Sequence, residues 1–148
     1  MRVFCFFLTF FCCFSAAQAE TPLVRATDAW VRATVPGQSA TGAFMTLYSD
    51  APMKLVEVRS PLAAVTEIHE MRVDENGVMR MRAISQLDLP AQKATPLKPG
   101  GRHIMLQALK KEARAGERTT LTLVLEDAEG HRHEIAADAE IRPLNAPH

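Results

Sequence analysis

Turn-forming residues divide this chain into short segments, and this division limits the fold more than any other feature of the sequence. The turn signals are Pro36-Gly37, Asp50-Ala51-Pro52, Glu75-Asn76-Gly77, Lys98-Pro99-Gly100-Gly101 and Glu129-Gly130. Such spacing favours strands over helices. The expected strands are residues 25–32, 43–48, 54–60, 65–73, 78–84, 103–106, 119–126 and 131–136. Residues 110–116 form either one helical turn or a loop. The pattern predicts a single all-β domain, an antiparallel β-sandwich or barrel.

The first residues have the composition of a signal peptide. Arg2 precedes an apolar run over residues 3–14, and Ala17-Gln18-Ala19 supplies an A-x-A cleavage site. The run is shorter than the about 20 residues that a membrane-spanning helix needs. We expect residues 1–19 to be removed after Ala19 and residues 20–148 to be exported to the periplasm, with a flexible tail at 143–148. An uncleaved anchor or a buried first helix is the alternative, and no later segment is expected to span a membrane.

All three cysteines, Cys5, Cys12 and Cys13, lie in the expected leader. Small residues do not precede Cys12 or Cys13, so a lipoprotein anchor is disfavoured. The exported chain would then have no thiol, and a metal site in it must use His, Met or carboxylate ligands. This excludes a blue-copper centre, which needs a cysteine thiolate.

Composition and motifs exclude several functional classes. The chain has 17 Lys and Arg, 17 Asp and Glu, and 47% hydrophobic residues. This balance argues against nucleic-acid binding, anionic-membrane binding and disorder. His69-Glu70 begins like a zincin helix, but Val73 stands where the second histidine is required. We therefore expect no enzymatic activity. The balanced charge and small size of the chain favour a monomer.

Histidines and methionines gather in the middle of the chain at positions of one parity. Residues two apart on a strand share a face, so each of three strands presents a pair of these side chains on one face. The set is His69, Met71, Met79, Met81, His103 and Met105. Ile68, Ile104 and Leu106 have the opposite parity and are expected in the core. The His and Met pairs should therefore face outward or toward a loop mouth. Met45 and Met53, outside the set, are expected to pack in the core.

The turn at Glu75-Asn76-Gly77 predicts how two of these strands pair. A three-residue loop with Gly77 in the left-handed conformation places Met71 opposite Met81, with His69 diagonal to Met81. A two-residue Asn76-Gly77 loop would instead pair Met71 with Arg82. Imidazoles combined with neutral thioethers favour Cu(I) over harder cations, and methionine resists the oxidation that closes paired thiols into disulfides.

These residues resemble the PCuAC family of periplasmic copper chaperones. The family motif is a His, an optional Met, ten residues, a Met, twenty-one residues, then His-x-Met, and His69, Met81 and His103-Ile104-Met105 have this spacing. Similar surroundings include Asp28-Ala29-Trp30, Gly42-Ala43-Phe44-Met45, Asn76-Gly77-Val78-Met79 and Leu97-Lys98-Pro99-Gly100-Gly101, so the resemblance covers residues 24–136. The optional Met is Glu70 here, which leaves Met71 as a substitute or additional ligand.

The resemblance implies a cupredoxin-like β-sandwich that binds Cu(I) through His69, Met81, His103 and Met105. It also implies delivery of copper to the CuA-bearing subunit of cytochrome c oxidase, beside a Sco-type thiol protein. A weaker secondary Cu(II) or Zn(II) site could use His131 and His133. The alternatives are a copper-resistance buffer and a metal-free exported interaction module.

Overall fold

The computed structural model describes residues 23–146. The expected signal peptide and its cleavage site lie outside the described residues, as do the last two positions of the expected tail. The described residues contain no helix, and so none that could cross a membrane. The strands are β1 (Val24–Arg32), β2 (Ala40–Ser49), β3 (Met53–Arg59), β4 (Ala63–Val73), β5 (Met79–Ile84), β6 (Leu87–Leu89), β7 (Thr95–Leu97), β8 (His103–Leu109), β9 (Arg118–Glu126) and β10 (Arg132–Arg142).

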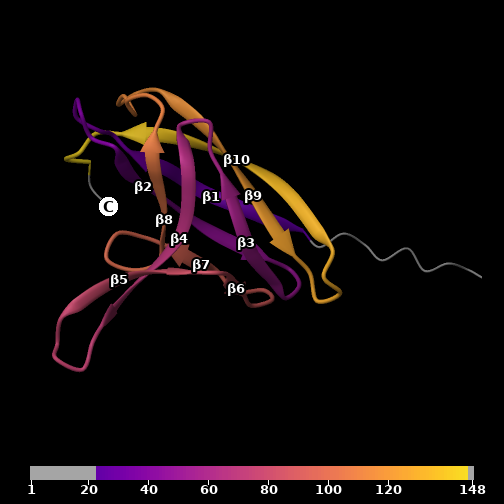
Figure 1. The fold of residues 1–148 in the computed structure, drawn as a ribbon. Coiled ribbons are helices and arrows are strands. Elements are labelled where there is room, and N and C mark those ends of the chain that lie inside the picture. Colours follow the sequence, from indigo (N-terminus) through magenta and orange to yellow (C-terminus); the bar gives the residue numbers. More distant parts are fainter. Residues whose placement is uncertain (1–22, 147–148) are drawn as a thin grey trace, which may run out of the picture.

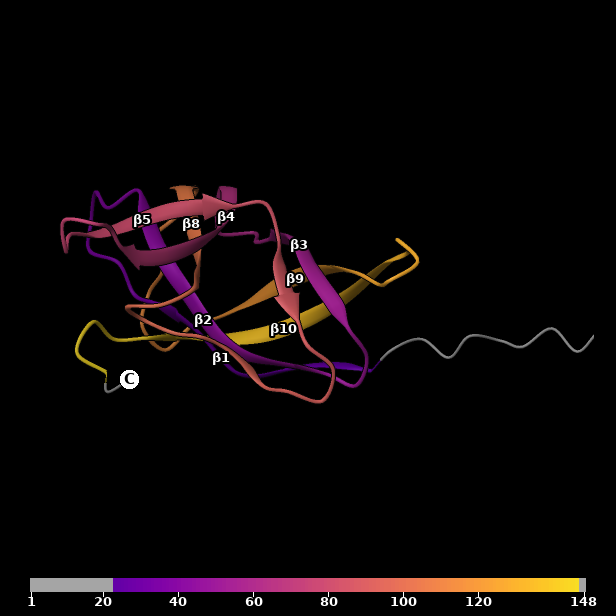
Figure 2. The same ribbon diagram turned by 90° about the horizontal axis from the view of Figure 1, so that it is seen from below.

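The strands form one curled sheet in the order β5-β4-β8-β2-β1-β10-β9-β3-β6, with β7 also paired to β2. Every pairing is antiparallel except that of β1 with β10, where Trp30 lies beside Glu140. Figure 2 shows β4, β5 and β8 on one side of the molecule and β1, β9 and β10 on the other. The curl brings β4 against β3, where the Thr66 hydroxyl donates to the Val58 carbonyl. The all-β prediction is confirmed, and the sheet is mixed rather than wholly antiparallel.

The core lies between the two sides of this curled sheet. Ile104 and Leu106 of β8 are fully buried, and Ile68 of β4 is buried beside them. Met45 and Met53 are buried as well, so their predicted packing role is confirmed. Leucines from the other strands complete the apolar interior, among them Leu47, Leu55, Leu121, Leu123 and Leu125.

The eight expected strands are present, but long-range pairing changes their extent. The sequence predicted that this strand ends at residue 136, but β10 runs to Arg142 because it pairs with β9 as far as Glu140 and with β1 from Glu140 to Arg142. The short strands β6 and β7 were not predicted, and each pairs with a distant strand. Residues 110–116 form a loop rather than a helical turn.

β4 changes partner along its length, which creates a projecting hairpin. Its residues Ala63 to His69 pair with β8, while Ile68 to Val73 pair with β5. Beyond His69 the strand therefore continues with β5 alone, and Figure 1 shows this β4–β5 hairpin extending away from the rest of the sheet. His69 lies where the hairpin begins, between His103 of β8 and Ala83 of β5.

Candidate metal centre

His69 and His103 lie directly opposite each other on the paired strands β4 and β8. Their ring centroids are 5.7 Å apart and the rings meet edge to face at 67°. Both residues are buried, with 8% and 7% of their surface exposed. The sequence predicted that they would face outward or toward a loop mouth. His103 does line a cavity bordered by Pro99 and Gly100 of the loop before β8, whereas His69 is buried and does not line it.

The thioethers stand beside this buried pair, on the hairpin and on β8. Gly77 has a φ of 76°, and the Asp74 amide donates to the Val78 carbonyl at 2.8 Å, as the three-residue loop requires. Met71 therefore pairs with Met81, which confirms the predicted register. Met81 is 49% exposed and Met71 is half-buried. The hairpin thus holds two thioethers near the surface, in the cavity that His103 also lines.

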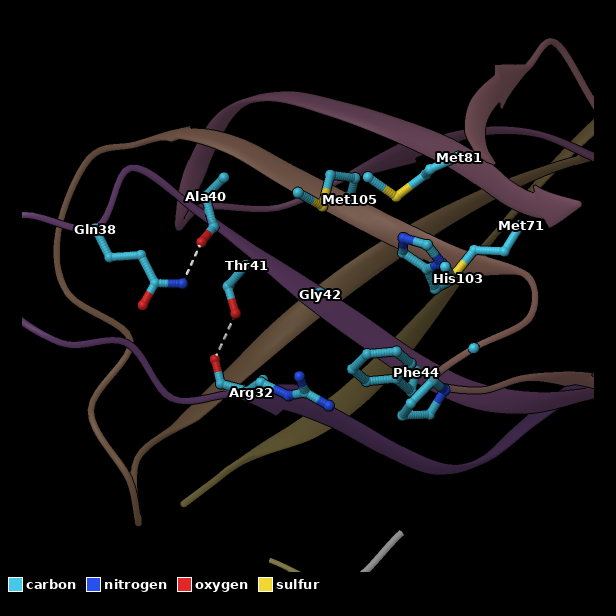
Figure 3. Close-up of a pocket in the computed structure, with 12 residues that line it drawn as sticks. Arg32, Gln38, Ala40, Thr41, Gly42, Phe44, Met71, Met81, His103 and Met105 are labelled. Carbon is cyan, nitrogen blue, oxygen red and sulfur yellow. Dashed lines mark hydrogen bonds between the residues drawn. The ribbon is translucent and has the colours of Figure 1, made fainter. Parts of the chain in front are cut away.

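A cavity of about 290 Å³ brings most of the candidate ligands together. His103, Met105, Met71 and Met81 all line it, whereas His69 and Met79 do not. Figure 3 shows the three methionine side chains gathered around the His103 ring, with Phe44 on the opposite side. Met71 and Met81 both border the cavity, so both remain candidates for the sulfur ligand that the hairpin would supply.

Aromatic rings support His103 from β1 and β2. The Phe44 ring lies 6.1 Å from the His103 ring and 4.4 Å from Trp30. Gly42 leaves room for Phe44, because a Cβ at Gly42 would come 2.7 Å from its Cζ. Gly42 and Phe44 belong to a segment that the sequence marked only through the family resemblance. Their close approach gives them a structural role in the shape of the cavity.

Hydrogen bonds leave one nitrogen of each imidazole available. His69 Nε2 lies 2.7 Å from the Glu67 carboxylate, while its Nδ1 is buried and makes no hydrogen bond. His103 Nδ1 lies 3.2 Å from the Gly101 carbonyl. Both partners are acceptors, so in a neutral imidazole the proton lies on the nitrogen that faces the partner, which is Nε2 in His69 and Nδ1 in His103. The free lone pairs are then on His69 Nδ1 and His103 Nε2.

Electrostatics keep His103 in the form that can bind a metal. Burial lowers the pKa of His103, and the neighbouring His69 and Arg32 lower it further. The ring is therefore neutral at pH 7, and a neutral imidazole has the lone pair that coordination requires. The His69 ring, through its hydrogen bond, also lowers the pKa of the Glu67 carboxyl.

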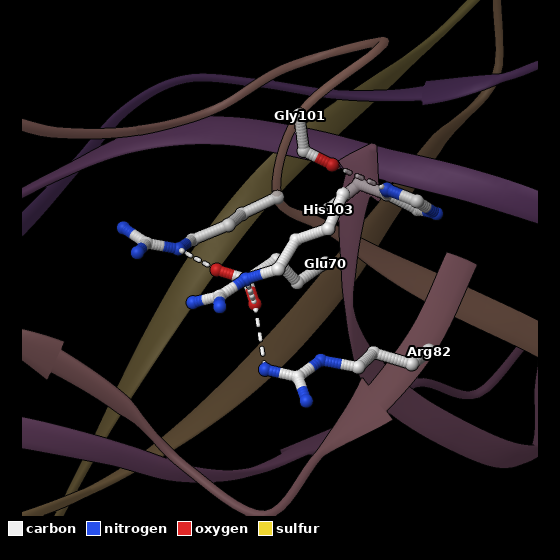
Figure 4. A network of polar contacts seen from close by, with 6 residues as sticks. Glu70, Arg82, Gly101 and His103 are labelled. Atoms are coloured by element: carbon white, nitrogen blue, oxygen red, sulfur yellow. Dashed lines mark hydrogen bonds and ion pairs between the residues drawn. The ribbon is translucent and has the colours of Figure 1, made fainter. Parts of the chain in front are cut away.

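Glu70 occupies the position of the family's optional methionine but lies on the other face of β4 from Met71. Its buried carboxylate accepts hydrogen bonds from Arg72 at 2.7 Å, Arg82 at 3.2 Å and Arg102 at 3.3 Å (Figure 4). The hydrogen bond from Arg72, followed by those from the other two guanidinium groups, lowers the Glu70 pKa. Glu70 thereby ties both hairpin strands to the residue before His103. Sequence reasoning identified it only as a departure from the motif.

His131 and His133 do not line this cavity, and they share one carboxylate. Asp127 Oδ2 lies 2.8 Å from His133 Nε2 and 3.3 Å from His131 Nδ1. His131 is in the turn before β10 rather than on the strand itself. Within residues 23–146, no group of three or more His, Cys, Asp or Glu side chains is placed to hold a metal. Among the described residues, the side chains that lie beside His103 in the cavity are instead methionines.

Comparison with known sequences identifies the family. A family model described as lipoprotein LpqE-like matches residues 24–137. The chain belongs to this family. A relative named as a lipoprotein, Lxx21020 of Leifsonia xyli subsp. xyli, is 33% identical over 117 residues, which are 75% of this chain and 70% of the relative. Lipoproteins are exported proteins, which agrees with the export predicted for this family member.

Solved structures join this LpqE-like chain to the PCuAC domains, as the motif spacing predicted. The apo PCuAC domain of PmoF1 is 26% identical, with a TM-score of 0.66 over 81% of this chain and 93% of the domain. The Cu(I) form of DR1885 from Deinococcus radiodurans is 32% identical, with a TM-score of 0.55 over 85% of this chain and 81% of its own. The copper-bound PCuAC domain of PmoF2, at 24% identity and a TM-score of 0.64, shares the fold.

Proposed function

We propose that this protein is a periplasmic Cu(I) chaperone that holds the ion through His69, His103, Met81 and Met105. The observation that carries the proposal is the buried imidazole pair, which has two free lone pairs beside a cavity lined by thioethers. Two nitrogens and two neutral sulfurs suit Cu(I) better than Zn(II), Mg(II) or Ca(II). The PmoF2 domain has been solved with copper bound and DR1885 with Cu(I) bound, which supports copper as the metal for this chain.

The different exposure of the ligands suggests how the ion is released. The imidazoles are buried, whereas Met81 is half exposed on a projecting hairpin. An acceptor thiolate can therefore reach the Met81 side of the site first and displace its thioether. The imidazoles hold the ion until the exchange is complete. Because thiolates bind Cu(I) more strongly than thioethers do, transfer proceeds downhill by ligand exchange and breaks no bond in a substrate.

The acceptor that we propose is the CuA-bearing subunit of cytochrome c oxidase, whose thiolate ligands fit this direction of transfer. A Sco-type thiol protein acts beside it, and the chaperone works as a monomer. The identity of the acceptor rests on family resemblance and on this chemistry. A copper-resistance buffer would have the same site but would not pass its ion to that subunit.

An anaerobic competition titration against a chromophoric Cu(I) chelator tests the site. The processed protein, purified from the periplasm, should bind one equivalent, while His103→Ala and Met105→Ala should lose high-affinity binding with the fold intact. Met79→Ala is the matched control because Met79 is exposed on the same hairpin but does not line the cavity. Unchanged affinity in His103→Ala and Met105→Ala would refute the site.

Transfer to an apo CuA domain tests the role. The Cu(I)-loaded protein, mixed with that domain, should lose its copper as the CuA absorption bands develop once an oxidant is supplied. Retention of copper under conditions in which free Cu(I) loads the domain would favour the buffer.

A further inference from the structure

Five side chains of alternate residues share one face of the β4–β8 pair: Glu67, His69, His103, Met105 and Gln107. Glu67 lies opposite Met105 in the register, just as His69 lies opposite His103. Two of the five, Glu67 and Gln107, belong to none of the ligand sets considered above. Their position beside the ligands raises the question of what they do there.

Glu67 and Gln107 form a hydrogen-bonded chain that ends on His69. The Gln107 amide donates to Glu67 Oε2 at 2.8 Å, and His69 Nε2 donates to the same oxygen at 2.7 Å. Glu67 is partly exposed and its backbone is held in the strand pairing, so a second donor from β8 restricts where its carboxylate can lie. The chain therefore orients the carboxylate toward the imidazole.

This arrangement determines which nitrogen of His69 can bind a metal. An ionised carboxylate only accepts hydrogen bonds, so it retains the imidazole proton on Nε2 and leaves the lone pair on Nδ1. That Nδ1 is buried without a hydrogen bond, which is costly unless another partner occupies it. His103 has the opposite arrangement, because the Gly101 carbonyl holds its proton on Nδ1.

We propose that Glu67, oriented by Gln107, is a positioning residue that makes His69 bind Cu(I) through Nδ1, while His103 binds through Nε2. The inference rests on the proposed function and assigns a role that the ligand motif does not contain. Carboxylates that accept the second N–H of a ligating histidine fix its tautomer and raise its basicity, and their loss typically reduces metal affinity about 10- to 100-fold.

Imidazole ¹⁵N chemical shifts test this assignment, because protonated, unprotonated and metal-bound nitrogens differ in shift. Long-range ¹H–¹⁵N spectra of the apo protein should show His69 protonated on Nε2. Addition of one equivalent of Cu(I) should move the Nδ1 resonance of His69 and the Nε2 resonance of His103. Cu(I) bound through Nε2 of His69, or an apo His69 protonated on Nδ1, would overturn the inference.

Variants of Glu67 separate positioning from charge. Glu67→Ala should give mixed His69 tautomers and reduce Cu(I) affinity by about 10-fold or more. Glu67→Gln keeps a carbonyl acceptor and should retain the Nε2–H tautomer and most of the affinity. A Gln variant with the wild-type tautomer but the affinity of the Ala variant would show that charge, not positioning, is responsible. Glu140→Ala, an exposed carboxylate of β10 paired with Arg142, is the matched control and should change neither readout.

Failure of this inference can be distinguished from failure of the proposed function. If the wild-type protein binds no Cu(I), the chaperone proposal fails, and the assignment of metal-binding nitrogens fails with it. If it binds one equivalent but Glu67→Ala changes neither the tautomer nor the affinity, only the role of Glu67 is refuted.

Discussion

The Phe44 ring occupies the space that a side chain at position 42 would need. A Cβ added to Gly42 would come 2.7 Å from Cζ of Phe44, closer than real Cβ contacts. Phe44 is held on its other side by Trp30, with ring centroids 4.4 Å apart. Gly42 also pairs with Met105, so this crowded position borders the candidate copper site.

Gly42→Ala should therefore lower both stability and Cu(I) affinity. The new methyl group must displace the Phe44 ring, and forced repacking of this kind costs about 1 to 3 kcal/mol. Thermal unfolding and the chelator titration measure the two effects. Gly101→Ala is the control for the stability measurement, because its Cβ would meet no atom closer than 3.6 Å. Equal behaviour of the two variants would show that the Gly42–Phe44 contact is unimportant.

Met71 and Met81 should act as partly interchangeable ligands. Both line the cavity and they lie opposite each other on the hairpin. We expect Met81→Leu to weaken Cu(I) binding more than Met71→Leu. The double variant should weaken it by more than the two single effects added together, because either sulfur can replace the other. A double-mutant cycle measured by competition titration, with Met79→Leu as control, checks this; strict additivity would contradict it.

Glu70→Gln should destabilise the fold, because Arg72, Arg82 and Arg102 would lose the anion that they share. The guanidinium groups are substantially exposed, so solvent screening limits the expected loss to about 1 kcal/mol. Thermal unfolding should show a smaller difference from wild type at high salt than at low salt. Glu112→Gln, which loses one exposed ion pair to Arg114, should have little effect at either salt concentration. Equal stability of Glu70→Gln and wild type at low salt would argue against the cluster.

Asp127 should make stability depend on pH in the acid range. Its hydrogen bond from His133, with backbone amides adding to the effect, lowers the Asp127 pKa from 3.8 to about 2. Because the folded-state value is the lower one, this stabilisation is complete above about pH 4 and is lost as the pH falls toward 2. Asp127→Asn should therefore be less stable than wild type at pH 7, and the two should converge near pH 2. Urea midpoints across this range measure the effect, and a constant difference would contradict it.

Local patterns in the sequence were sufficient to predict where the main strands lie and how the two strands of the β4–β5 hairpin pair. A turn that contains Gly77 determines the pairing of its two flanking strands, because register there depends only on loop length and conformation. The alternation of residues likewise placed Ile104 and Leu106 in the core. Because side chains alternate between the two faces of a strand, the same pattern placed His103 and Met105 on the face opposite Ile104 and Leu106.

Contacts between segments distant in the sequence decided the remaining strand pairings and the surroundings of the candidate site. The parallel pairing of β1 with β10 and the short strands β6 and β7 depend on how the sheet curls over its core, which local alternation does not encode. The fold also buries His69 and His103, while the pairing of β4 with β8 brings Gln107 to Glu67 and Arg102 to Glu70. The sequence by itself determined the type and spacing of the soft side chains. Only tertiary structure decided their burial and which of them border one cavity, because both depend on neighbours supplied by other strands.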